Sequence, residues 1–141
     1  MSFGARWEDW EANYKDSNQE SFKPSDNMNG GKISLSNNQS ENTTFFASVA
    51  KGYKQGGFNL GTGLNNSEFN NSINYDPESL INYEVGINKL LPNADGYLDL
   101  VFFYSDRKDQ QFLRSTQVDP QDPNTFLYLT RNAAQGRNYG L

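Results

Sequence analysis

The sequence predicts an all-β chain whose antiparallel up-and-down strands form part of a transmembrane β-barrel, about six strands of a larger barrel. Three observations predict this fold. Apolar and polar side chains alternate along the clearest stretches. Clusters of Asn, Ser, Gly, Asp and Pro separate these stretches. Long and short connections alternate along the chain, as they do when tight turns lie at one rim of a barrel and large loops at the other.

The first hairpin is preceded by a strand around residues 3–7 that extends toward Tyr14. The hairpin itself joins residues 31–36 to residues 43–54 through the short polar link 37–42. The second of these strands, residues 43–54, is rich in β-branched and aromatic residues. The adjacent pair Phe45-Phe46 interrupts the alternation, so the pattern alone does not assign its faces.

The second hairpin has the clearest alternation in the chain. Residues 80–91 and 97–111 flank a Pro-Asn-Ala-Asp link at 92–95, which is typical of a tight turn. Both strands exceed the ~9 to 11 residues that a tilted strand needs to cross a bilayer. One face of the hairpin carries Asn82, Glu84, Gly86 and Asn88. The other face is apolar and includes Ile81, Tyr83, Val85, Ile87, Leu98, Leu100, Phe102 and Tyr104.

A last strand covers residues 125–130 and continues toward Leu141. The long connections are then residues 16–30, 55–78 and 112–124, which we expect to be loops at the same rim. Of these, the segment 55–78 is the longest. It is therefore the best candidate to reach a solute.

Composition excludes several classes of function. The chain of 141 residues has 12 basic and 17 acidic residues, a formal net charge of -5, which disfavours nucleic acid as a partner because phosphate binding needs cations. It contains no cysteine and no histidine, so thiolate and imidazole metal sites and Ser-His-Asp or Cys-His catalysis are excluded. We therefore expect no enzyme activity, catalytic residue, cofactor or metal site.

Four segments carry a family resemblance. Residues 47–59 read Ala-Ser-Val-Ala-Lys-Gly-Tyr-Lys-Gln-Gly-Gly-Phe-Asn. This resembles TonB-dependent outer-membrane receptors, in which a strand ending in Gly-Tyr-Lys runs into a glycine pair and Phe-Asn. Three further segments look like family stretches in the same order: residues 75–86, with Asp-Pro-Glu and Tyr-Glu-Val-Gly, residues 101–111, and residues 132–141, with Asn-Ala-Ala and Tyr-Gly-Leu.

The resemblance implies a receptor that takes up a scarce solute of siderophore, vitamin or carbohydrate type across the outer membrane of a Gram-negative bacterium. Implied partners are outer-membrane lipid, the solute, and the TonB energy-coupling system acting through a plug domain. No signal peptide and no plug are visible in residues 1–141. We therefore expect the chain to be a fragment of a barrel domain, because about six strands are too few to close a barrel of ~8 or more.

Polar residues at alternate strand positions are candidates for the solute path. We expect Arg6, Lys51, Glu84 and Arg107 to face the barrel lumen, although a hydrated wall would need the same residues. If the resemblance to TonB-dependent receptors holds, the candidate lumen-facing or loop contacts to solute are Lys51, Tyr53, Phe58, Glu84 and Arg107.

A second fold would also suit the composition. A soluble extracellular β-sandwich could bind glycans through exposed Trp and Tyr side chains. The two folds differ in burial of the apolar face, because a sandwich covers it with a second sheet and a barrel wall leaves it outside. The residues that discriminate are Ile81, Tyr83, Val85, Ile87, Leu98, Leu100 and Phe102.

Overall fold

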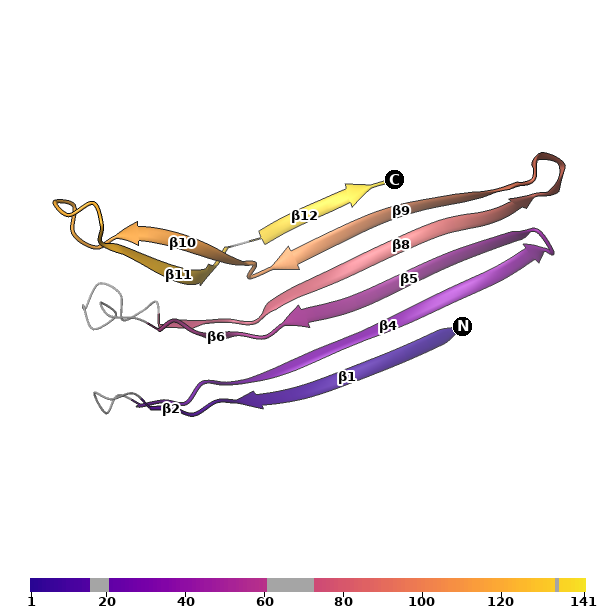
Figure 1. Cartoon of the computed structure of the whole chain (residues 1–141). Coiled ribbons are helices and arrows are strands. Elements are labelled where there is room, and N and C mark those ends of the chain that lie inside the picture. The colour runs from indigo at the N-terminus through magenta and orange to yellow at the C-terminus, as the bar shows by residue number, and fades with distance from the viewer. Residues whose placement is uncertain (16–20, 61–72, 134) are drawn as a thin grey trace.

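The computed structural model describes residues 1–15, 21–60, 73–133 and 135–141. Within them, six strands form one antiparallel sheet in which each strand pairs with the next one of that sheet along the chain (Figure 1). The all-β fold class predicted from the sequence is confirmed. The six strands are β1 (Ser2–Glu11), β4 (Ser25–Ser40), β5 (Thr43–Lys54), β8 (Glu78–Leu91), β9 (Gly96–Lys108) and β12 (Gln135–Gly140).

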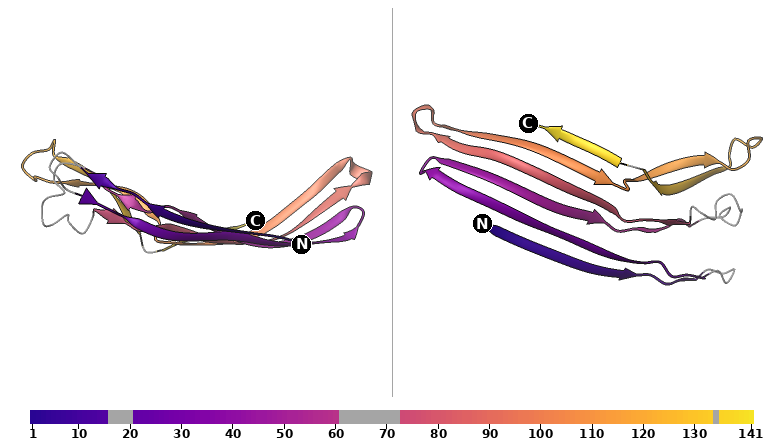
Figure 2. Two further views of the ribbon diagram at one scale, coloured as in Figure 1. Left: turned by 90° about the horizontal axis from the view of Figure 1, so that it is seen from below. Right: turned by 180° about the vertical axis from the view of Figure 1, so that it is seen from behind.

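The sheet is a single curved layer and is open (Figure 2). Its order is β1-β4-β5-β8-β9-β12, so β1 and β12 are the edge strands. Among the described residues, the structure contains no helix with the length and apolar character that a membrane crossing requires. The sheet has the up-and-down order of a barrel wall, and its two edges do not pair with each other.

The predicted hairpin of β8 and β9 is confirmed, with a register that runs from Ser79↔Lys108 to Leu91↔Gly96. Its turn is the short 3₁₀ helix η2 (Pro92–Ala94), followed by Asp95 in the left-handed conformation at φ 44°. The hairpin of β4 and β5 is also confirmed. Its turn is only Glu41 and Asn42, because β4 continues through the predicted link to Ser40.

The structure corrects the start of β4. The predicted loop 16–30 includes β3 (Ser21–Phe22), which pairs with β2 (Tyr14–Lys15), and the first residues of β4. Ser25 to Gly30 are strand because they pair with Glu11 to Arg6 of β1. Residues 16–20 and 61–72 lie outside the described residues. The predicted loop 55–78 contains β6 (Gly57–Phe58) paired with β7 (Asn74–Tyr75).

The structure also corrects the predicted loop 112–124. Residues of this segment form β10 (Gln111–Gln117), which pairs with β11 (Phe126–Asn132) in a separate two-stranded sheet, here called the arm. The predicted strand 97–111 ends at Lys108, because Asp109 adopts the left-handed region at φ 54° and the chain bends there. The predicted last strand is accordingly divided into β11 and β12 (Figure 1).

Candidate functional site

The strand register assigns side chains to two faces of the six-stranded sheet. The first, called the apolar face, has a transverse row that crosses every strand of that sheet. The residues of this row are exposed, with exposed fractions from 40% for Tyr104 to 81% for Phe3. Toward the short turns a second apolar row follows, with Leu35, Val85 and Phe102. The first row consists of Phe3, Ile33, Val49, Tyr83, Tyr104 and Tyr139.

The opposite side, called the polar face, carries a chain of hydrogen bonds across three strands. Ser48 Oγ donates to Glu84 Oε2 at 3.2 Å, and Asn82 Nδ2 donates to Glu84 Oε1 at 2.8 Å. Ser105 Oγ donates in turn to Asn82 Oδ1. The Glu84 carboxylate therefore accepts hydrogen bonds from β5 and β8, as a carboxylate on a hydrated face should.

Two aromatic rings of the polar face lie over glycines. A Cβ added at Gly86 would stand 2.5 Å from Cζ of Phe46, and one at Gly140 would stand 2.9 Å from Cε1 of Phe103. Glycine therefore makes room for each ring. The Phe45-Phe46 pair is now assigned, because Phe45 pairs with Ile87 on the apolar face and Phe46 pairs with Gly86 on the polar face.

Nearer the long connections, the polar face has a hollow of about 620 Å³. Glycines widen it, including Gly4 and Gly52, where an added Cβ would meet nothing within 4 Å. By register Tyr53 pairs with Ser79, on the same side of β5 as Lys51, but its side chain reaches the border of this hollow. There it donates a hydrogen bond of 2.8 Å to Glu8 Oε2, and Arg6 forms an ion pair with the same carboxylate. The Arg6 guanidinium carbon also lies 5.7 Å from the centroid of the Tyr53 ring, within cation–π range.

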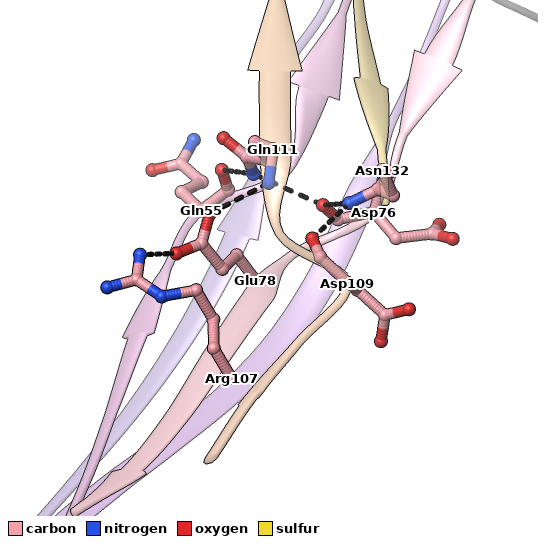
Figure 3. A network of polar contacts seen from close by, with 7 residues as sticks. All are labelled: Gln55, Asp76, Glu78, Arg107, Asp109, Gln111 and Asn132. Carbon is pink, nitrogen blue, oxygen red and sulfur yellow. Dashed lines mark hydrogen bonds and ion pairs between the residues drawn. The ribbon is translucent and has the colours of Figure 1, made fainter. Parts of the chain in front are cut away.

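A polar network joins the arm to the sheet (Figure 3). At its centre Glu78 is only 6% exposed. The Glu78 carboxylate forms an ion pair with Arg107 and accepts a 2.8 Å hydrogen bond from the backbone N–H of Gln111. The Gln111 amide Nε2 donates to the carbonyls of Gln55 at 2.7 Å and Asp76 at 3.2 Å.

Asn132 completes this network from β11. Its Nδ2 donates to the carbonyl of Asp76 at 2.9 Å and to the carbonyl of Asp109 at 2.7 Å, while its Oδ1 accepts from the Asp76 N–H at 2.8 Å. Both strands of the arm are thereby fixed to the residues that precede β8. The set is called the Glu78 network and consists of Gln55, Asp76, Glu78, Arg107, Asp109, Gln111 and Asn132.

A second attachment of the arm is the side chain of Asn59, which is 8% exposed. Asn59 Nδ2 donates to the carbonyl of Thr130 at 2.9 Å, and Asn59 Oδ1 accepts from the Thr130 N–H at 2.7 Å. Leu127 and Leu129 of the arm are buried beside Ile73. Sequence reasoning gave Asn59 no role of its own, although it ends the Gly-Gly-Phe-Asn stretch of the family resemblance, because its partner Thr130 is far away in the sequence.

The predicted site residues do not gather at one place. Glu84 and Arg107 lie on the polar face, whereas Lys51 pairs with Gly31 and Ile81 and lies on the apolar face. The expectation that Lys51 shares a face with Arg6, Glu84 and Arg107 is therefore wrong. Phe58 is half-buried with its ring centroid 5.4 Å from that of Tyr14.

Comparison with known families gives a match over the whole chain. The family described as TonB dependent receptor-like, beta-barrel matches residues 1–141. No curated protein matches the chain. No solved structure matches it either.

Proposed function

Because the chain belongs to the β-barrel family of TonB-dependent receptors, we propose that it supplies wall strands and extracellular loops to a receptor that takes up a scarce solute. The family consists of outer-membrane receptors and transporters of Gram-negative bacteria. The solute is of siderophore, vitamin or carbohydrate type. Energy reaches the receptor from TonB through a plug domain, and the chain acts in transport rather than as an enzyme.

The observation that carries this proposal is the uncovered apolar face of a single-layered sheet. None of the seven residues that a β-sandwich would bury is buried here; Val85 is 55% exposed and Phe102 is 54% exposed. Within the part of the chain that the structure describes, no second sheet covers them (Figure 2). Lipid is the cover that suits such a face, since barrel strands present apolar side chains outward at every second position.

Further strands complete the barrel in this proposal. In the sheet as described, β1 pairs only with β4 and β12 only with β9. An open edge cannot face lipid, because its N–H and C=O groups would lack partners. Additional strands of the receptor therefore pair with β1 and β12, and the polar face then surrounds the plug.

The proposed solute contacts lie at the long-connection end of the polar face and in the adjoining loops. Tyr53 borders the hollow there, and Phe58 belongs to the β6–β7 loop. Glu84 and Arg107 line the same face. Aromatic and charged groups around a concave surface suit the recognition of a small polar solute.

Growth of a strain that lacks the full-length receptor tests the proposal. The strain is supplied separately with a ferric siderophore, a corrinoid vitamin or an oligosaccharide as the limiting nutrient. We expect one of the three to stop supporting growth, and uptake of that labelled solute by the wild type to stop when a protonophore removes the energy source. Unchanged growth on all three, or uptake that resists the protonophore, would contradict the proposal.

Aromatic substitutions then test the proposed contacts. Tyr53→Ala and Phe58→Ala should weaken solute binding to cells, whereas Tyr97→Ala should not, because Tyr97 lies at the opposite end of the sheet beside the short turn. Equal losses in all three variants would point to a general assembly defect and overturn the assignment of the two contacts.

A further inference from the structure

Basic side chains border the apolar face on the side of the long connections. The next row on that face lies two residues along each strand from the row of Phe3 to Tyr139, toward the long connections. It contains Lys51 on β5, Asp106 on β9 and Arg137 on β12. The next step on the same face brings Lys108, which pairs with Gln135 and Ser79. Charge thus begins where the apolar rows end.

This border is positive although the chain as a whole is negative, with a formal net charge of -5. Arg137 Nε lies 3.4 Å from Asp106 Oδ1, and the Arg137 side chain is still 62% exposed. Lys51 donates a hydrogen bond to the amide oxygen of Asn29. In the described residues, neither Lys51 nor Lys108 takes part in an ion pair. In these two rows three cations therefore stand against one carboxylate, that of Asp106.

The spacing allows these cations to act on one ligand. Lys108 and Arg137 are diagonal neighbours on adjacent strands, a relation that separates Cα atoms by about 7–8 Å and lets long side chains meet. Lys51 is three strands from Arg137, about 14 Å at the usual strand spacing. Lys and Arg stems lie along apolar surface while their charged ends reach the polar layer of a membrane.

We propose that Lys108 and Arg137, flanked by Lys51, bind the phosphate of an anionic lipid headgroup at the outer border of the barrel. These three residues are called the cationic rim. The inference rests on the proposed function, because it takes the apolar face to be the face against lipid. Bound there, a lipid lays its acyl chains along the exposed rows while its phosphate accepts hydrogen bonds from the guanidinium and ammonium groups.

The opposite border of the apolar face differs. Toward the short turns, the last row of that face that pairs across β5, β8 and β9 is Thr43, Lys89 and Leu98, with a single cation. A lone lysine is the ordinary anchor at a membrane interface. At the other border three cations, two of them on the adjacent strands β9 and β12, match an anionic headgroup rather than a general need for solubility.

Lipid selectivity of the purified full-length receptor in detergent tests this inference. Quenching of its tryptophan fluorescence is titrated with brominated phosphatidylglycerol and, separately, with brominated phosphatidylcholine. The test variant is Lys108→Gln with Arg137→Gln. Lys32→Gln is the matched control, because Lys32 is exposed on the polar face, paired with Gly4 and Ala50.

We expect the wild type to prefer phosphatidylglycerol, and the test variant to lose about fivefold of that preference for each cation removed. With Lys108→Gln kept, Arg137→Lys in place of Arg137→Gln should restore part of the preference. Asp106→Asn in the otherwise wild-type receptor should increase the preference. The Lys32→Gln control should behave as the wild type does. Inorganic phosphate should not abolish the preference, because a headgroup is held by its acyl chains as well.

The inference would be overturned by an unchanged preference in the test variant, by an equal loss in Lys32→Gln, or by complete competition by inorganic phosphate. Failure of the proposed function has another signature. In that case neither brominated lipid quenches the receptor, because the apolar face does not meet acyl chains at all. Quenching by both lipids without selectivity overturns the cationic rim alone.

Discussion

The two ends of the sheet are held together by different means. At the short-turn end, the β4–β5 and β8–β9 hairpins close through Glu41 and Asn42 and through η2, and backbone pairing continues to the turns. At the long-connection end, side chains connect segments far apart in sequence: Gln111 contacts Gln55 across 56 residues. Regular alternation thus fixes one end locally, whereas the other depends on a few buried polar groups.

The largest expected effect comes from placing a charge on the apolar face. Val85 is 55% exposed and pairs with Ala47 and Phe102 on that face. An arginine near the bilayer midplane costs roughly 2–4 kcal/mol in outer-membrane barrels. We expect Val85→Arg in the full-length receptor to lower the yield of assembled barrel, measured as the heat-modifiable band on a gel.

Asn88→Arg is the matched control, because Asn88 lies on the polar face of the same strand, opposite Thr44 and Asp99. This variant should assemble nearly as well as the wild type. If both variants assembled equally, or if Asn88→Arg were the more damaging, the assignment of the two faces would be wrong.

The Glu78 network gives the next largest effect. Glu78→Gln removes the charge that pairs with Arg107 and weakens the acceptor for the Gln111 N–H. Hydrogen bonds to charged groups contribute about 1.5–3 kcal/mol. We expect faster hydrogen exchange in β10 and β11, measured by mass spectrometry on the assembled receptor, with little change in β8 and β9 near the turn.

Glu41→Gln is the control for charge removal, because Glu41 is exposed in the β4–β5 turn. It should leave exchange in the arm unchanged. Faster exchange spread evenly over the sheet in Glu78→Gln would contradict the view that the network acts only on the loop end.

A substitution at glycine probes the contact between Phe46 and Gly86. Gly86→Ala would put a Cβ 2.5 Å from Cζ of Phe46 and 2.8 Å from the carbonyl oxygen of Leu100. Overpacking of this kind typically costs about 1–3 kcal/mol. We expect a lower denaturant midpoint for unfolding of the receptor from lipid vesicles, and we expect Gly52→Ala, where the added Cβ meets nothing within 4 Å, to change it little.

The division between predictable and unpredictable parts follows the two ends of the molecule. Period-2 alternation predicted the β8–β9 hairpin, because one face must be apolar and a slip of one residue would reverse both faces. It did not predict the arm. The bend at Asp109 and the pairing of Gln111 with Asn132 depend on a left-handed residue and on contacts from distant segments.

The site shows the same division. Lys51 was expected on the polar face, because its charge suggested a hydrated environment. The register instead places it at the border of the apolar face, where a long cationic side chain can extend to the headgroup layer. Residue type alone therefore misassigned a position that strand pairing decides.

The smallest expected effect concerns the second attachment of the arm. Asn59→Ala removes both hydrogen bonds to the backbone of Thr130, while the Glu78 network and the contact of Leu127 and Leu129 with Ile73 remain. A neutral hydrogen bond contributes about 0.5–1.5 kcal/mol. We expect faster exchange at Thr130 and its neighbours in β11, with the unfolding midpoint of the receptor nearly unchanged. If Asn59→Ala slowed exchange or left it unaltered while Glu78→Gln accelerated it, the Glu78 network alone would hold the arm.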